Sequence, residues 1–149
     1  MKITYLFPII IIFAASCHKN TFDFINEYER SEKIYYGNNM VLAQKSLSYF
    51  ISQSEANEIE ARKTKGVVYH MGLAMACLRM ASICAIKGDS DCSEAYMNKA
   101  IVYFDQEPSF ANDVNYIKDK KAVLINFLDK IESSIRPEWK KVFNQRANQ

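Results

Sequence analysis

The sequence predicts an all-α protein, a small bundle of antiparallel helical hairpins with about five to six helices. Its 149 residues leave room for one domain, and 49% hydrophobic and 24% charged residues are ordinary for a globular chain. Only 4 glycines and 3 prolines stand against 9 tyrosines and 9 phenylalanines, which indicates few turns and an aromatic interior. Apolar residues recur at helical spacing, and no alternating strand pattern competes with them.

The N-terminal segment 1–16 has the anatomy of a secretory signal peptide. A positive start at Met1 and Lys2 precedes an apolar run from Tyr5 to Ser16. At about 12 residues this run is too short to span a membrane as a helix, which takes about 20. We therefore expect residues 1–16 to be removed and to form no part of the fold.

The apolar run ends in the letters AASC at 14–17, which resemble the lipobox of bacterial lipoproteins, where small residues precede an obligatory cysteine. The resemblance implies that Cys17 is lipidated and becomes the first residue after cleavage, with 17–21 as a tether and 22–149 as the helical domain. Acyl chains anchor a protein because each buried methylene contributes about 0.8 kcal/mol. The alternative is an ordinary secretory signal cut near Ser16, with Cys17 an incidental thiol.

The lipoprotein resemblance also implies a compartment, the bacterial cell envelope, with the membrane as a partner through the N-terminal lipid. His18 follows the cysteine, where some proteobacterial lipoproteins carry an aspartate that retains them in the inner membrane. The outer membrane, with the domain facing the periplasm or the surface, is therefore the implied location.

Two helices are expected at the start of the domain. The first carries Phe24, Ile25, Tyr28, Tyr35 and Tyr36 and ends at the stop signal GNN. The second follows that turn and ends near Ser54, and its apolar positions are Val41, Leu42, Ala43, Leu47, Tyr49, Phe50 and Ile51.

A third, long segment is expected from Glu55 to Lys87. Ser54 can cap its start, Gly66 and Gly72 mark a bend within it, and Gly88 ends it.

The C-terminal half of the domain predicts three further helices. Asp91 and Glu94 form a capping-box-like start for the fourth, which runs to about Asp105 before Pro108. Pro137 opens a short last helix that bears Trp139 and Phe143. Between these lies a fifth helix of about 20 residues, indicated by a stripe of residues at steps of three and four: Val114, Ile117, Lys121, Leu124, Leu128, Ile131 and Ile135.

A weak internal repeat supports pairing of these helices. The letters KSLSYF at 45–50 recur as KAIVYF at 99–104, each in a helix that follows a glycine turn. Together with small residues on both sides of Gly88, the second unit resembles a tetratricopeptide repeat over about 35 residues. The resemblance implies a concave helical surface that binds other proteins. A generic helical hairpin is the alternative, because any close helix crossing needs small residues.

Cysteine counting leaves one candidate disulfide. If Cys17 is acylated, Cys77, Cys84 and Cys92 remain, and Cys84 and Cys92 flank the turn at Gly88. An oxidising envelope would permit a bridge between them. Three buried thiols are the alternative.

No metal, cofactor or catalytic site is expected. His70, Cys77 and Cys84 share a helical stripe, but each step of seven residues spans about 10.5 Å, too far for ligands of one ion. Asp89 and Asp91 suit helix capping better than a calcium loop, which would need a central glycine and a terminal glutamate. Without a nucleophile or metalloprotease motif, we expect no enzyme.

A protein partner is the remaining expectation. The formal net charge of +2 is too small to indicate nucleic acid, which takes a strongly basic stripe. Tyrosine is enriched at interfaces, so the candidate contact residues are Tyr35, Tyr36, Tyr49 and Tyr103, with burial in the core as the alternative for each.

The sequence therefore predicts a membrane-anchored envelope lipoprotein that binds another protein, as a scaffold or a pilotin-like assembly helper. A second hypothesis within the class of protein-binding proteins is an immunity protein that neutralises a toxin in the periplasm. An envelope enzyme that acts on peptidoglycan or lipid is the rival from another class, and it would have to use His70 or the acidic residues as catalytic groups.

Overall fold

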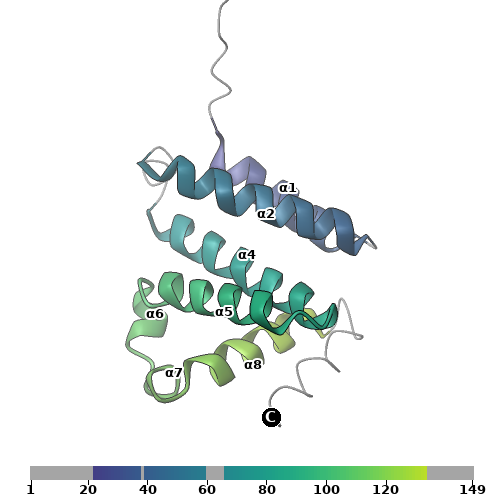
Figure 1. The fold of residues 1–149 in the computed structure, drawn as a ribbon. Coiled ribbons are helices and arrows are strands. Elements are labelled where there is room, and N and C mark those ends of the chain that lie inside the picture. The colour runs from purple at the N-terminus through teal and green to yellow at the C-terminus, as the bar shows by residue number, and fades with distance from the viewer. Residues whose placement is uncertain (1–21, 38, 60–65, 134–149) are drawn as a thin grey trace, which may run out of the picture.

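The computed structural model describes residues 22–37, 39–59 and 66–133, and they form helices, with no strand among them. Figure 1 shows the helices in layers, with the α1/α2 hairpin at one end, α4 and α5 in the middle and α7 and α8 at the other end. The all-α class predicted from the sequence is confirmed. The helices are α1 (Phe24–Tyr35), α2 (Met40–Ala56), α4 (Gly66–Ile86), α5 (Ser90–Phe104), α6 (Pro108–Ala111), α7 (Val114–Lys118) and α8 (Lys120–Glu132).

The first hairpin forms where the apolar spacing predicts it. The Asp23 carboxylate accepts a hydrogen bond from the Asn26 backbone N–H at 3.2 Å and caps α1. Asn39 caps α2 in the same way, with its side chain accepting from the Leu42 N–H at 2.9 Å. The two helices bury Phe24 and Phe50 against each other, with ring centroids 5.1 Å apart.

The second helix ends near Ser54, as predicted, but the predicted role of Ser54 as the cap of the next helix is wrong. Ser54 lies inside α2 and is fully buried, so it caps nothing, and the helix continues to Ala56. Asn57 ends it, with its backbone N–H donating to the Gln53 carbonyl at 3.0 Å. The start of the predicted third segment falls partly on 60–65, which lies outside the described residues.

Helix α4 is the core of the bundle and packs against both α2 and α5. Its window Tyr69–Ile86 is apolar and long enough to cross a membrane, but 78% of it is buried inside the protein, as expected of a core helix. The predicted bend at Gly72 is wrong, because α4 runs through it as one helix. A Cβ there would lie 2.9 Å from Phe24 Cζ, so Gly72 serves the close approach of α1 to α4.

Of the two acidic residues that the sequence assigns to helix capping, Asp89 caps α5, and the capping box predicted to start at Asp91 is wrong. Gly88 adopts a positive φ of 77°, which glycine reaches without strain, and Asp89 follows it as the N-cap. The Asp89 carboxylate accepts from the Cys92 N–H at 3.0 Å. Asp91 stands within the first turn of α5 instead, where its negative charge suits the helix dipole.

The predicted fifth helix of about 20 residues is divided in two. Asp119, with φ −149° and ψ 85°, leaves the helical conformation between α7 and α8. Its carboxylate accepts from the Ala122 N–H at 3.0 Å and caps α8, so a side-chain hydrogen bond replaces helical continuation. Lys121, placed in the apolar stripe by its spacing, is exposed and pairs with Glu94.

The break and the short helix after Pro108 raise the number of helices in the described part to 7, above the predicted five to six. The rest of the predicted C-terminal helices, with Ile135, Pro137, Trp139 and Phe143, lies outside the described residues.

Candidate protein-binding groove

An open groove of about 300 Å³ lies between α1 and α2. All of its lining residues belong to this first hairpin, so the groove opens on the end layer of the bundle in Figure 1. The lining residues are Glu27, Arg30 and Ile34 from α1, and Leu42, Lys45, Ser46 and Tyr49 from α2.

Helical periodicity places the α2 side of the groove on one face. Leu42, Lys45 and Tyr49 follow one another at steps of three and four, which brings side chains onto the same stripe. The next stripe of α2 carries the buried Leu47 and Phe50. The side chains of Leu42 and Tyr49 are therefore left 53% and 51% exposed at the edge of the core.

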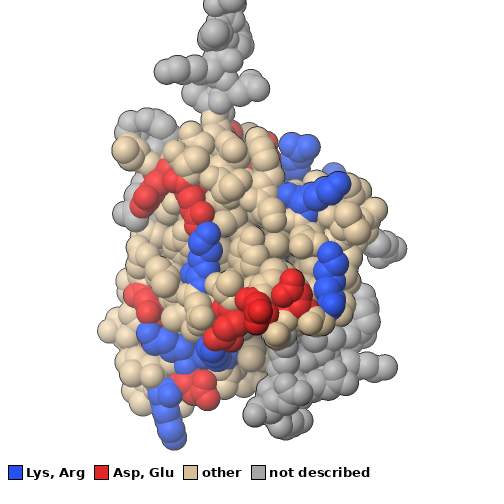
Figure 2. Space-filling view, in the orientation of Figure 1, with Lys and Arg blue, Asp and Glu red and all other residues tan. Residues whose placement is uncertain are grey.

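The groove is positively charged overall. Arg30 Nη1 lies 3.6 Å from Glu27 Oε2, so these two charges offset each other in part. Lys45 is exposed and makes no ion pair among the residues that the structure describes. In Figure 2, Lys and Arg side chains lie over the right-hand part of the α1/α2 layer, whereas acidic side chains lie over its left end and over α5. The rest of this face mixes both signs.

The candidate tyrosines separate into different environments. Tyr49 lies in the groove, as a contact residue should. Tyr35 is fully buried, which contradicts its prediction as a contact residue, because it shares the core face of α1 with Phe24. Tyr36 is half-buried and its hydroxyl accepts from Arg79 Nη2 at 2.7 Å.

Tyr103 is occupied within the fold. Its hydroxyl donates to Glu55 Oε1 at 2.7 Å, and Lys99 Nζ lies 2.9 Å from Glu55 Oε2. Burial raises the pKa of Tyr103, and the neighbouring Glu55 carboxylate raises it further. The Lys99–Tyr103 pair thus holds one carboxylate from the end of α2.

A buried arginine that spacing did not single out joins several helices. Arg79 in α4 is only 2% exposed, and its Nη2 lies 2.7 Å from Glu32 Oε1 of α1 while its Nε lies 3.5 Å from Glu132 Oε1 of α8. Burial alone would lower the pKa of Arg79, but the hydroxyls of Tyr28 and Tyr36 and the two carboxylates raise it overall. In the sequence, Arg79 is the only Lys, Arg, Asp or Glu of the apolar helix α4, and this isolated charge could have indicated the cluster.

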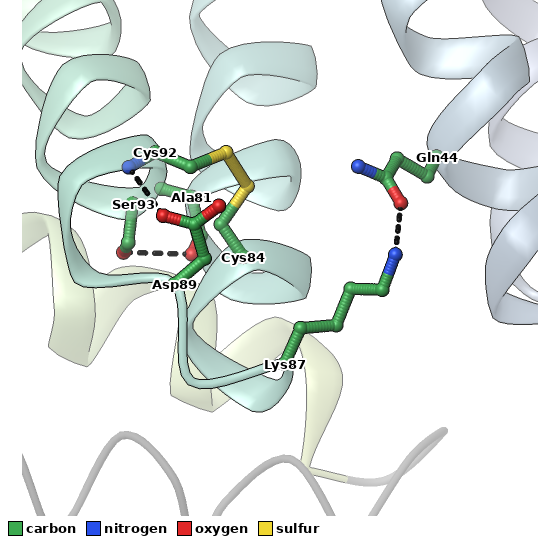
Figure 3. Close-up of a disulfide and its surroundings, with 7 residues drawn as sticks. All are labelled: Gln44, Ala81, Cys84, Lys87, Asp89, Cys92 and Ser93. Carbon is green, nitrogen blue, oxygen red and sulfur yellow. Dashed lines mark hydrogen bonds between the residues drawn. A yellow bond between two sulfur atoms is a disulfide. The ribbon is translucent and has the colours of Figure 1, made fainter.

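The structure joins Cys84 and Cys92 in a disulfide across the Gly88 turn, with their Cα atoms 5.7 Å apart (Figure 3). These are the two cysteines that flank the turn in the sequence. Beside the bridge, the Ser93 hydroxyl donates to the Ala81 carbonyl at 2.8 Å, which ties α5 to α4 a second time.

Cys77 is a buried free thiol, and burial raises its pKa to about 12. At neutral pH the Cys77 side chain is therefore almost entirely the protonated thiol, whereas a nucleophile or a metal ligand must be the thiolate. His70 Nδ1 lies 3.9 Å from Glu107 Oε1, a pair without a third ligand. No group of three or more His, Cys, Asp or Glu side chains that could hold a metal occurs in residues 22–37, 39–59 and 66–133.

The predicted lipidation site, Cys17, lies outside the described residues. Comparisons of the chain with protein-family models, with curated proteins and with solved structures found no match.

Proposed function

We propose that the chain is a lipid-anchored protein of the bacterial envelope whose helical domain binds another protein, as a scaffold or a pilotin-like assembly helper. The observation that carries the binding role is the groove of the first hairpin, where Leu42 and Tyr49 are half exposed beside Lys45. Exposed apolar side chains gathered in a concave, charged rim are typical of a protein contact.

The anchor rests on the AASC motif at 14–17 and on the apolar run before it. A lipid at Cys17 would leave only the short stretch 18–23 between the membrane and the first residue of α1. The groove would then face a partner within reach of the same membrane. A tetratricopeptide-like pairing of the hairpins belongs to this proposal, since repeats of this kind present surfaces for protein binding.

Fractionation of cells that produce the wild-type chain and Cys17→Ser tests the anchor. We expect the wild-type chain in the membrane fraction, with the mass of an acylated N-terminal peptide that starts at Cys17. The variant should move to the soluble fraction, since one residue carries the lipid. A Cys17→Ser chain that stayed quantitatively in the membrane fraction would refute the anchor.

Site-specific photo-crosslinking tests the binding role. A photoreactive side chain at Leu42 should join the anchored protein to one reproducible partner, whereas the same group at Val102, which is 58% exposed on α5, serves as the matched control. The identity of the partner, an envelope-assembly component or a toxin, decides between an assembly helper and an immunity protein. Equal and diffuse crosslinking at both positions would contradict a dedicated binding face.

A further inference from the structure

The two halves of the internal repeat occupy equivalent places in the two hairpins. Segment 45–50 lies in α2 and segment 99–104 lies in α5, and each helix is the second of its hairpin. The last residues of the segments, Phe50 and Phe104, are both fully buried. The two segments therefore share a core position at their last residue, although Leu47 is buried and its counterpart Ile101 is only partly buried, so the helices turn somewhat different faces to the core. The lysine and the tyrosine of each segment can still be compared.

In the second hairpin, the repeat holds a carboxylate from a neighbouring helix. Lys99 and Tyr103, one turn apart on α5, both contact the Glu55 carboxylate: Lys99 Nζ lies 2.7 Å from Oε1 and 2.9 Å from Oε2, and the Tyr103 hydroxyl donates to Oε1 at 2.7 Å. Glu55 comes from the last turn of α2. A lysine and a tyrosine at this spacing thus form a two-point receptor for one carboxylate, and hydrogen bonds to a charged group are the stronger kind.

In the first hairpin, the equivalent pair is unoccupied by any described residue. Lys45 and Tyr49 have the same one-turn spacing and both line the groove, but neither the Lys45 ammonium nor the Tyr49 hydroxyl contacts a carboxylate in the part of the chain that the structure describes. Arg30 adds a second positive charge, against the single negative charge of Glu27. The rim therefore complements an acidic ligand.

We propose that the groove binds a helix of a partner protein that presents a glutamate or an aspartate to Lys45 and Tyr49. This inference rests on the proposed function and specifies the chemistry of its partner. Leu42 lies seven residues before Tyr49, about 10.5 Å along α2, so apolar side chains at positions i and i+7 of the bound helix match the groove. We favour a helix over a membrane surface as the ligand, because a flat membrane would touch only the edges of the groove, whereas the side chains of a helix can enter it.

A displayed library of helical peptides of about 16 residues, about four turns, is a direct probe of this groove. Selection uses the full mature chain with its lipid, held in detergent. We expect the selected peptides to carry an acidic residue one turn from a large apolar residue. The dissociation constant of these peptides should rise about tenfold in Lys45→Gln and about tenfold in Tyr49→Phe, because each variant removes one hydrogen bond to the carboxylate.

Matched variants separate the groove from the rest of the surface. Lys118→Gln removes the same charge from an exposed site on α7 and should leave peptide affinity unchanged. Tyr103→Phe removes the same hydroxyl from the occupied pair, so it should lower thermal stability and leave peptide affinity unchanged.

Three outcomes would overturn the inference. Selected peptides could lack acidic residues, or they could bind wild type, Lys45→Gln and Tyr49→Phe equally. The third is that no peptide is enriched while phosphatidylglycerol vesicles bind Cys17→Ser in a Lys45-dependent manner, which would assign the groove to lipid. If a cellular partner crosslinks from Val102 and not from Leu42, the proposed function stands and this inference alone fails.

Discussion

Arg79 joins three helices through one guanidinium. It bonds to Glu32 in α1 and to Glu132 in α8 from its place in the core helix α4. The centroids of the Tyr35 and Tyr36 rings lie 5.0 Å and 5.2 Å from its Cζ, so cation–π contacts add to the ion pairs. Because the cluster is buried, each member depends on the charge of the others.

We expect Arg79→Met to lower the free energy of unfolding by about 3–5 kcal/mol, because it removes the cation that pairs with the buried Glu132 carboxylate. Urea unfolding followed by circular dichroism measures this. Two variants isolate the cause. Glu132→Gln keeps a hydrogen-bond acceptor and should cost about 1 kcal/mol, and Arg79→Met combined with Glu132→Leu should regain part of the loss. A loss below about 1 kcal/mol in Arg79→Met would contradict the role given to this cluster.

The tyrosines show what spacing alone can predict about a residue. Tyr49 and Tyr103 hold the same place in the repeat, and the sequence gives no reason to expect different surroundings for them. Only the tertiary structure distinguishes them. Glu55 accepts a hydrogen bond from the Tyr103 hydroxyl, whereas no carboxylate among the described residues contacts the Tyr49 hydroxyl. Tyr35 is buried and not a contact residue, and spacing cannot decide between these two because an exposed tyrosine and a buried one satisfy the same helical pattern.

At the scale of the element, periodicity predicted where helices lie better than where they end. The first hairpin and α5 formed as expected, whereas Ser54 and Asp91 were assigned caps that they do not form. A cap is one hydrogen bond, and several neighbouring residues can supply it, so spacing cannot choose among them. At Asp119 the apolar stripe continues through a real break: Leu124 and Leu128 after the break are buried, whereas Val114 and Ile117 before it are 77% and 60% exposed, so only the second part of the stripe faces the core.

The disulfide fastens the middle hairpin at its turn. Cys84 in the last turns of α4 and Cys92 in the first turn of α5 close a loop with a sequence separation of 8. We expect Cys84→Ser combined with Cys92→Ser to lower the free energy of unfolding by about 2–3 kcal/mol, since the unfolded chain regains the freedom of this loop. Thermal unfolding of the wild type with and without reductant, and of the double variant, measures the loss.

Cys77→Ala is the matched control for the bridge, because it removes the buried thiol and leaves both bonded cysteines in place. Reductant should still lower its melting temperature by the same amount as in the wild type. A double variant as stable as the wild type, or a wild type indifferent to reductant, would show that the bridge contributes nothing to the fold.

At the scale of the whole molecule, the groove follows from the order of the layers. The second hairpin is covered on both sides. The end of α2 contacts its Lys99–Tyr103 pair, and α8 packs against α4 and α5. The first hairpin stands at the end of the stack (Figure 1). Its groove is lined by residues of α1 and α2 alone among the described residues. A hairpin at the end of a stack has one face without a neighbouring hairpin, and a partner can pack there.

The buried titrating groups of the bundle all shift in one direction. Burial raises the pKa of Cys77 from 9.0 to about 12, and burial is also the largest cause of the raised pKa values of the tyrosines. The affected tyrosines, each raised from 10.0, are Tyr28, Tyr36, Tyr103 and Tyr116. The folded state thus keeps protons that the unfolded chain releases in alkali, because the pKa of Cys77 and of each of these tyrosines is raised.

The fold should therefore lose stability in alkali. A group whose pKa is raised by folding contributes its full stabilisation below its unfolded pKa, and this contribution disappears as the pH rises towards the folded value. For Cys77 that window runs from 9.0 to about 12. Each such group lowers the free energy of unfolding by at most about 1.4 kcal/mol per pH unit. Urea unfolding between about pH 7 and about pH 11 should show a plateau followed by a steady fall from about pH 9.

Cys77→Ala separates the thiol from the tyrosines in this measurement. It removes the group with the lowest unfolded pKa, so the fall should begin about one pH unit later, where the tyrosines of the unfolded chain start to ionise. It also removes the free thiol that could attack the Cys84–Cys92 bridge in alkali, so a fall that persists in Cys77→Ala is due to titration and not to disulfide exchange. A free energy of unfolding that stays constant to about pH 11 would mean that these side chains reach water in the folded state, against the burial that holds the core of the bundle together.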